Sequence, residues 1–213
     1  MQIDLREVVP DFIEREKMAA SQVWGKNLTI NKGEHLHIVA PSGSGKTSLM
    51  HFIYGLRKDF SGIILYDDLP IKKLSTEGFS SFRQNKISII FQDLRLFQGQ
   101  TVRENLEIKR ALNPFHEAVA IEEMATRLGI RSKLDKPAIT CSYGEQQRIA
   151  IIRSLMQPFD FLLLDEPYSH LDDANRIKAM ELIYEECEKR NAAMVFADLK
   201  LLDFLKGEKV VML

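Results

Sequence analysis

The segment Ala40-Pro41-Ser42-Gly43-Ser44-Gly45-Lys46-Thr47 has the residue types needed to hold a chain of phosphates. Glycines allow backbone N–H groups to close around phosphate oxygens. A lysine after the last glycine can reach the outer phosphates, and the neighbouring hydroxyl can hold Mg²⁺. Ala40 stands where this pattern usually begins with glycine, and alanine is small enough for that position. The segment predicts a phosphate-binding loop with ligand contacts from Pro41, Ser42, Gly43, Ser44, Gly45, Lys46, Thr47 and Ser48.

Two adjacent carboxylates, Asp165 and Glu166, could complete a metal site. They directly follow the apolar run at 161–164, which predicts a buried strand. Ligands of open α/β sheets bind beyond the carboxyl ends of the strands, where these two side chains would lie. We expect Asp165 to hold Mg²⁺ directly or through water. We expect Glu166 to act as a base toward an attacking water.

These groups need a framework of strands and helices to bring them together. Apolar runs predict strands at 36–39, 63–66, 87–91, 161–164, 194–196 and 210–213. The phosphate-binding loop follows the first of these strands and precedes a helical run at 48–56, which is the order that such a loop requires. Strands that alternate with helices indicate an α/β fold with a mostly parallel sheet.

The central part of the chain breaks this alternation. From about Asp93 to Pro158 it shows helical patterns and no good strand. Thr101 and Glu104 have the spacing of a capping box at the start of one helix. Apolar residues recur at helical spacing in the segments after Pro114 and after Asp172: Ile121, Met124, Ala125 and Leu128, then Ile177, Met180, Tyr184 and Cys187. We expect a helical subdomain at about 93–157, inserted into the α/β core of a single domain that spans 1–213.

Charge and cysteine content narrow the function classes. The 213 residues include 29 Lys and Arg against 30 Asp and Glu, a net charge of −1. This balance provides no long-range attraction for nucleic acid, so we expect no nucleic-acid partner. Two cysteines are too few for a disulfide framework and fit a reducing compartment. The charged N-terminus is unlike a signal peptide, and no apolar run approaches the ~20 residues of a membrane helix.

Five motifs occur in the order found in the ATP-binding-cassette (ABC) ATPases. Cys141-Ser142-Tyr143-Gly144-Glu145-Gln146-Gln147-Arg148 resembles the signature motif of that family. Gln92 matches its Q-loop, and Ser169-His170-Leu171-Asp172 matches its D-loop. With the phosphate-binding loop and the acidic strand end, the resemblance covers nearly the whole chain. The segments at 92–93 and 101–106 are most similar to the small ATPase subunits of bacterial export and lipoprotein-release systems.

The resemblance implies a fold and a reaction. The fold would be that of a P-loop NTPase of the ABC ATPase type: a RecA-like α/β core, an antiparallel β subdomain from the N-terminal third, and a helical subdomain. The cofactors would be ATP and Mg²⁺. Thr47, Gln92 and Asp165 would surround the metal, and Glu166 would be the catalytic base. Hydrolysis of ATP would drive a membrane permease.

The signature segment also implies a dimer. Residues 144–157 read as a packed helix whose N-terminus offers the Ser142 hydroxyl and backbone N–H groups to an anion. In the family this end caps the γ-phosphate bound by the other subunit, so Ser142 and Gly144 would act in trans across a homodimer or heterodimer of nucleotide-binding subunits. Integral membrane permease subunits would be further partners. The location implied is cytoplasmic, peripheral on the cytoplasmic face of the inner (plasma) membrane.

Three positions depart from the family pattern or leave a choice open. Tyr143 replaces the commoner glycine of the signature motif. Asp198 stands where the family usually has a histidine near the γ-phosphate, and a carboxylate there repels that phosphate and is expected to slow turnover. Phe12 occupies roughly the place of the family's adenine-stacking aromatic, with a core role as the alternative, and Trp24 is a weaker candidate. His37 is expected at a solvated strand edge.

Some residues bear on three other functions. Asp198 favours a nucleotide-gated dimerisation switch with weak hydrolysis, while Glu166 and Gln92 oppose it. Soluble ABC proteins that work on ribosomes or DNA usually carry two cassettes or a long coiled-coil insertion, and neither occurs here. A GTPase is disfavoured because no guanine-specificity motif follows the phosphate-binding loop.

Overall fold

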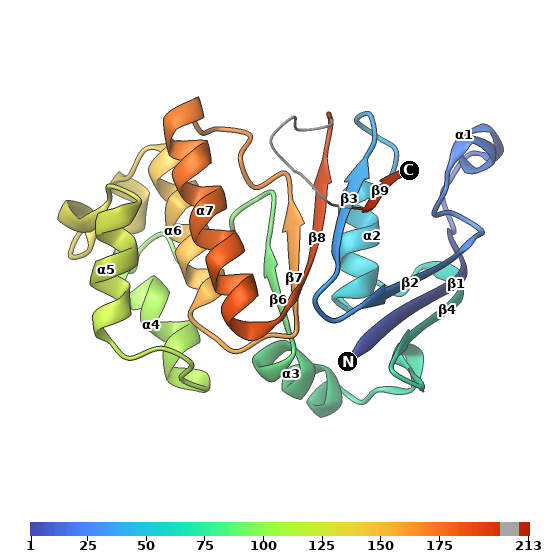
Figure 1. The fold of residues 1–213 in the computed structure, drawn as a ribbon, viewed down its shortest axis with the longest axis horizontal. Coiled ribbons are helices and arrows are strands. Elements are labelled where there is room, and N and C mark those ends of the chain that lie inside the picture. The colour runs from blue at the N-terminus through green and yellow to red at the C-terminus, as the bar shows by residue number, and fades with distance from the viewer. Residues whose placement is uncertain (201–208) are drawn as a thin grey trace.

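The computed structural model describes residues 1–200 and 209–213 (Figure 1). The strands are β1 (Gln2–Pro10), β2 (Asn27–Asn31), β3 (His35–Val39), β4 (Phe60–Tyr66), β5 (Leu69–Pro70), β6 (Ile87–Ile90), β7 (Phe161–Asp165), β8 (Ala193–Asp198) and β9 (Lys209–Met212). The α-helices are α1 (Arg15–Ala20), α2 (Lys46–Ile53), α3 (Thr76–Asn85), α4 (Val102–Leu112), α5 (Val119–Arg127), α6 (Tyr143–Leu155) and α7 (Asp173–Arg190). Short 3₁₀ turns occupy Ile71–Lys73, Arg131–Lys133 and Ala138–Thr140.

A parallel sheet in the order β6-β7-β8-β3-β9 forms the centre of the molecule. Every pairing in it is parallel, so the carboxyl ends of its strands lie at one edge. β7 is buried along its whole length, which suits its continuous run of apolar residues. The six strands expected from apolar runs are all present, with ends that differ from the prediction by at most three residues.

The N-terminal third supplies a second, antiparallel sheet in the order β2-β1-β4-β5. A bulge interrupts the β1–β4 pairing between Arg6 and Val9. Glu7 takes a left-handed φ of +50° at the bulge, and the facing Gly62 has φ +82°. A Cβ at Gly62 would lie 2.4 Å from the Glu7 carbonyl oxygen, so glycine is required there.

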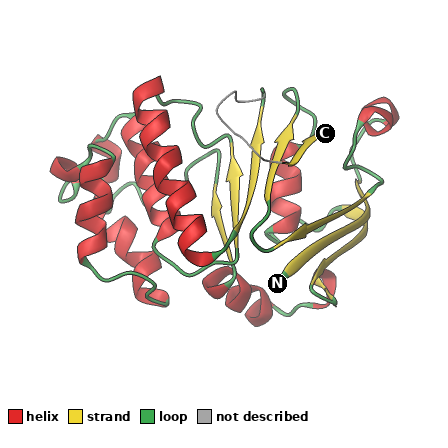
Figure 2. Ribbon diagram, in the orientation of Figure 1, coloured by secondary structure: helices red, strands yellow, loops and turns green. Residues whose placement is uncertain are grey.

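Helix α2 lies between the two sheets in Figures 1 and 2. Its apolar side chains, including Leu49 and Phe52, share one core with Ile3 of β1, Ile64 of β4 and Phe161 of β7. This packing fixes the start of α2, and therefore the loop before it, against both sheets.

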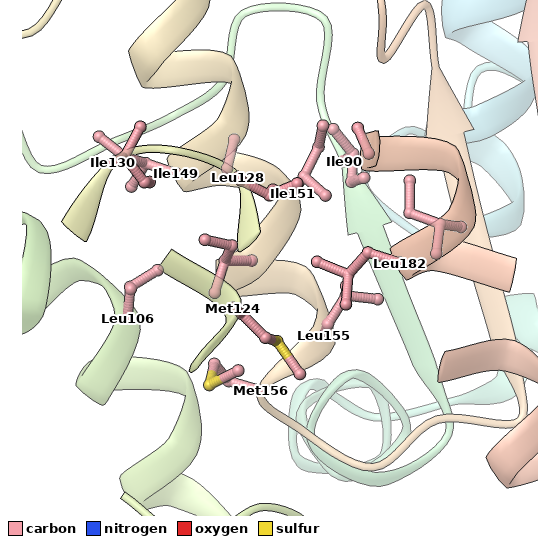
Figure 3. Close-up of a cluster of buried hydrophobic side chains, with 14 of the residues drawn as sticks. Ile90, Leu106, Met124, Leu128, Ile130, Ile149, Ile151, Leu155, Met156 and Leu182 are labelled. Atoms are coloured by element: carbon pink, nitrogen blue, oxygen red, sulfur yellow. The ribbon is translucent and has the colours of Figure 1, made fainter. Parts of the chain in front are cut away.

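A second core joins helices α4 to α7 to the other face of the parallel sheet. Figure 3 shows side chains from these helices and from β6 converging there, among them Leu106, Met124, Ile149, Leu182 and Ile90. The segment between β6 and β7 contains helices and, within the described chain, no β-pairing beyond the single bridge Thr101–Pro137. The capping box of Thr101 and Glu104 starts α4, as predicted.

Two details of the sequence interpretation are wrong. Ile177 was expected on the apolar face of α7, but its side chain is 52% exposed, because the buried face of α7 runs through Ala179, Ile183 and Cys187. His37 was expected at a solvated edge, but it is fully buried beside Phe196, because β3 lies between β8 and β9. Among the described residues, no helix combines the length and apolar character that crossing a bilayer would require.

Candidate nucleotide site

Four neighbouring strands deliver the predicted site residues to one edge of the parallel sheet. The phosphate-binding loop follows β3, and Gln92 lies two residues after β6. Asp165 is the last residue of β7, and Asp198 is the last residue of β8. The register pairs Val39 with Asp198 and Asp165 with Ala197, so these strand ends are level with one another.

The phosphate-binding loop is supported from the core by the buried Trp24 side chain. Its Nε1 donates a hydrogen bond of 3.1 Å to the carbonyl oxygen of Ser44. Gly45 has φ +101°, and a Cβ there would lie 3.0 Å from the Trp24 ring. Trp24 is 1% exposed, so it belongs to the core and does not offer a face for base stacking. The weaker stacking candidate is therefore excluded, and Trp24 supports the loop instead.

A groove of about 240 Å³ lies over this loop. Its lining brings together most of the predicted contact residues: Phe12, Ser42, Gly43, Gly45, Lys46, Thr47, Ser48, Gln92 and Glu166. Pro41 and Ser44 belong to the loop without lining the groove, and Ser44 is buried. The same groove thus carries cationic, hydroxyl, amide and carboxylate groups, which is the donor set that a metal-bound polyphosphate requires.

Lys46 points into the loop that it terminates. Its Nζ donates to the carbonyl oxygens of Ala40 at 2.9 Å and Pro41 at 3.2 Å, and lies 3.4 Å from Oε1 of Glu166. Lys46 is 4% exposed. Glu166 has a left-handed φ of +48°, a costly conformation for a residue with a side chain and one that is concentrated at functional sites.

A chain of side-chain contacts connects Thr47 to Glu166. The Thr47 hydroxyl donates to Oε1 of Gln92 at 3.3 Å. Nε2 of Gln92 donates to Oε2 of Glu166, also at 3.3 Å. Gln92 therefore bridges the hydroxyl expected at the metal and the carboxylate expected to act as base.

Asp165 lies behind this chain, and it fits a cation. It is 1% exposed, and neither carboxylate oxygen has a hydrogen-bond partner among the described residues. Burial, against the opposing effect of the Thr47 hydroxyl and the Lys46 ammonium and with a smaller contribution from the Glu166 charge, raises the pKa of Asp165 to about 6. A buried carboxylate without partners is costly, and Mg²⁺ takes oxygen ligands of this kind. The residues present therefore suit Mg²⁺.

Asp198 lies close enough to the site to interact with its charges. Burial raises the pKa of Asp198, and the Glu166 charge adds to this, while the backbone N–H of Leu199 and the Lys46 charge oppose it. Its carboxylate Oδ1 accepts from the Leu199 N–H at 2.6 Å. The structure thus places the Asp198 carboxylate at the end of β8, at the same sheet edge as Asp165.

Phe12 borders the groove with a half-exposed ring, so a base could stack on it. Sequence reasoning missed its neighbour Arg57. The Arg57 guanidinium lies 4.9 Å from the centre of the Phe12 ring and donates to the Ser48 hydroxyl at 3.0 Å. A run of Arg57, Lys58 and Asp59 reads as an ordinary surface turn, which gave no signal of this contact.

Ser142 and Gly144 are not brought into this groove. Ser142 is the N-cap of α6, with a complete capping box to Glu145. A Cβ on Gly144 would lie 2.9 Å from the His170 carbonyl oxygen, so glycine lets the signature helix approach the D-loop. Gln147, to which no role was assigned, donates to the Glu166 carbonyl oxygen and accepts from the His170 N–H.

Comparison with known proteins places the chain in a family. Residues 24–169 match the ABC transporter family. The lipoprotein-releasing system ATP-binding protein LolD of Legionella pneumophila (strain Lens) is 32% identical over 174 residues, covering 80% of this chain and 77% of LolD. The macrolide export ATP-binding/permease protein MacB of Campylobacter fetus subsp. fetus (strain 82-40) is 33% identical over 85% of this chain, which spans 28% of MacB.

Solved structures show the same fold. A dimeric ATP-binding cassette in a post-hydrolysis state bound to ADP and Pi has a TM-score of 0.80 at 24% identity, covering 93% of this chain and 88% of that one. A putative ABC transporter ATP-binding protein from Pyrococcus furiosus has a TM-score of 0.77 at 17% identity, covering 99% and 98%. These likenesses confirm the predicted P-loop architecture with two sheets. From the groove, the motif order and these matches, we conclude that the chain belongs to the ABC transporter family as an ATPase subunit of the lipoprotein-release and export type.

Proposed function

We propose that the chain binds ATP with Mg²⁺ in the groove over the phosphate-binding loop and hydrolyses it to drive a membrane permease. The observation that carries this proposal is the line of contacts from Thr47 through Gln92 to Glu166, with Lys46 beside it. A plain structural turn would not need to gather a cation, an amide and two carboxylates at one strand edge.

Each residue in the groove has a role that follows from its chemistry. Lys46 exchanges its carbonyl and carboxylate partners for the outer phosphates. Thr47, Gln92 and Asp165 would hold Mg²⁺, which would neutralise charge on the phosphate oxygens when bound. Glu166 accepts a proton from the attacking water while the Gln92 amide orients that water. The face of Phe12 stacks on the adenine.

The second half of the site comes from another subunit. Ser142 and the first N–H groups of α6 lie outside the groove of their own chain, which supports a role toward a nucleotide bound elsewhere. We propose that two subunits, identical or not, enclose two ATP molecules between the loop of one and the signature helix of the other. The relatives named above support permease partners and a peripheral position on the cytoplasmic face of the inner membrane.

The test is release of phosphate from ATP by the purified chain, with and without Mg²⁺, and with GTP as the comparison nucleotide. We expect Mg²⁺-dependent hydrolysis that prefers ATP. Capture of a multi-span membrane protein with the tagged chain, identified by mass spectrometry, tests the permease partner. A chain that binds no nucleotide at millimolar ATP would overturn the proposal.

Asp198 favours a second function: a nucleotide-gated dimerisation switch with weak hydrolysis. Its carboxylate is close enough to Glu166 for the two charges to interact. An added negative charge opposes the build-up of charge on a γ-phosphate. Stable ATP-dependent dimers in the wild-type chain, with phosphate release slower than dimer dissociation, would identify the switch. Turnover of ATP faster than dissociation of the dimer would identify an ATPase that drives a permease.

A further inference from the structure

Tyr143, the first residue of α6, reaches the loop that follows β6. Its Oη donates to the backbone carbonyl oxygen of Gln92 at 3.3 Å. Its ring lies against the His170 imidazole, with ring centres 4.2 Å apart. A glycine at this position could make neither contact. The tyrosine therefore gives this chain a direct connection between the signature helix, the D-loop and Gln92.

The other end of α6 holds the same loop. Arg153 donates through Nη1 to the carbonyl oxygen of Arg95 at 2.7 Å and through Nη2 to that of Leu94 at 2.6 Å. Leu94 and Arg95 have left-handed φ values of +58° and +47°, which cost energy for residues with side chains. Hydrogen bonds from α6 offset that cost. The loop at 92–95 is thus held at both ends by one helix.

A third residue of α6, Gln147, contacts the backbone of Glu166, the proposed base. Gln147, one turn after Tyr143, is 1% exposed and donates to the Glu166 carbonyl oxygen at 3.3 Å. It accepts from the His170 N–H at 3.0 Å. The first turns of α6 therefore contact the backbone on both sides of the Gln92–Glu166 hydrogen bond.

We propose that Tyr143 is a positioning residue, whose hydroxyl fixes the Gln92 backbone so that the Gln92 side chain bridges Thr47 and Glu166. This inference rests on the proposed function, in which Gln92 serves the metal and the water. The N-terminus of α6 is also the end proposed to meet the other subunit's phosphate. One helix end would thus contact Gln92 in its own subunit's site and the phosphate in the other subunit's site.

The experiment compares Tyr143→Phe, which removes the hydroxyl and keeps the ring on His170, with Tyr143→Leu, which removes both contacts. Thr140→Val is the matched control. It deletes a hydroxyl just before the same helix, where Thr140 donates to the Pro137 carbonyl oxygen without touching Gln92. Hydrogen–deuterium exchange of peptides covering 88–97 is measured first, in the ligand-free chain. The Mg²⁺ concentration that gives half-maximal phosphate release is measured second.

Loss of one such hydrogen bond should make amide exchange in 91–96 about three- to tenfold faster in Tyr143→Phe, with no change in Thr140→Val. Half-maximal Mg²⁺ should rise by about threefold or more, while half-maximal ATP at saturating Mg²⁺ changes less than twofold. A merely structural role would move the melting temperature without separating these two constants.

Wild-type exchange and Mg²⁺ dependence in Tyr143→Phe, in a chain whose wild type hydrolyses ATP, would overturn this inference and leave the proposed function standing. A wild-type chain that does not hydrolyse ATP would overturn both. Wild-type Mg²⁺ dependence in Tyr143→Phe together with altered Mg²⁺ dependence in Tyr143→Leu would assign the effect to the ring on His170. That outcome would also overturn the role of the hydroxyl.

Discussion

Lys46 makes its contacts with groups that a phosphate can replace. Two are backbone carbonyl oxygens of its own loop and one is the Glu166 carboxylate. None is an apolar core contact, so the lysine serves the ligand more than the fold. The loop itself is held by Trp24 and by the packing of α2, which remain when Lys46 is changed.

Lys46→Ala should therefore abolish ATP binding while leaving the fold nearly intact. The expected loss is at least about 100-fold in affinity, because charge-assisted contacts to phosphate are strong in a partly buried site. Calorimetry with ATP and Mg²⁺ measures it, and circular dichroism monitors the fold. Lys178→Ala, an exposed lysine on α7, is the control. Equal ATP affinity in Lys46→Ala would contradict the assignment of the loop.

Asp198 should limit turnover. Removing one positioned electrostatic contact typically changes rates by about 100- to 1000-fold in other enzymes. The effect here should be smaller, about three- to tenfold, because Lys46 and the metal would also neutralise the charge that builds up on the γ-phosphate. Asp198→His should raise steady-state phosphate release and Asp198→Ala should raise it less, with the exposed Asp135→His as control. An unchanged or lower rate in Asp198→His would show that this carboxylate does not act on the phosphate.

Asp165 should make the ligand-free chain less stable as the pH rises. Its pKa of about 6 lies above the ordinary value of 3.8, so the folded state binds the proton more tightly than the unfolded state. The stability that Asp165 contributes through its tighter proton is fully present below about pH 4 and is lost as the pH rises through 6. Asp165→Asn should be more stable than wild type at pH 8, by up to about 3 kcal/mol, and similar at pH 4. Urea unfolding in EDTA across this range measures the difference, and equal curves at pH 8 would refute it.

At the scale of single residues, the sequence predicted most of the groove, because the phosphate-binding loop and the residues after parallel strands have local signatures. Lys46 and Thr47 were predicted from the residue pattern of the loop between a strand and a helix, and Glu166 from its position after an apolar run. Arg57 and Trp24 were not, because their contacts with Phe12 and Ser44 join segments that are distant in sequence. Nothing local to Trp24 says which loop its N–H will meet.

The elements around the groove convert this local chemistry into geometry. Trp24 lies just before β2, yet its ring supports the loop between β3 and α2. The contact makes one buried hydrogen bond and limits Gly45 to glycine. The shape of the phosphate-binding loop thus depends on the N-terminal sheet as well as on its own glycines.

Trp24→Phe should loosen the loop. It leaves the buried Ser44 carbonyl oxygen without a donor, at a cost of about 1–3 kcal/mol, and should weaken ATP binding several-fold. Tyr66→Phe is the matched control, since it loses a buried hydrogen bond to the Ile53 carbonyl oxygen away from the loop. Chemical denaturation and calorimetry on both variants separate stability from binding. A similar loss of ATP affinity in both would contradict a specific role for Trp24.

The burial of His37 and of Ile177 was predicted wrongly because it depends on long-range packing. Strands β3, β8 and β9 were predicted, but their order in the sheet was not, and burial of His37 depends on β8 and β9 flanking β3. Burial lowers the pKa of His37 to about 4, so the ring is neutral in the core. Ile177 has the spacing of a buried position, yet the face of α7 that meets α6 is set by packing.

At the scale of the whole molecule, our proposal assigns the signature helix and the groove to different halves of a two-subunit site. Glu166→Gln should therefore give ATP-dependent dimers that persist. The amide cannot accept the proton of the attacking water, and it removes a negative charge near the triphosphate.

Light scattering with ATP and Mg²⁺ should show a dimer of Glu166→Gln and a shorter-lived dimer of the wild type. Glu166→Gln combined with Lys46→Ala is the control and should stay monomeric. A monomer under every condition at tens of micromolar protein would show that assembly needs the membrane partner.

The pairing of Lys46 with Glu166 has a consequence for the order of events in a catalytic cycle. In the ligand-free chain the Lys46 ammonium and the Glu166 carboxylate lie in contact, so the positions of the two side chains are linked. A polyphosphate that takes the lysine as its partner would break this contact and leave the carboxylate with the Gln92 amide, which it already contacts. Binding of the nucleotide and release of the base would then be one event, which precedes any attack by water.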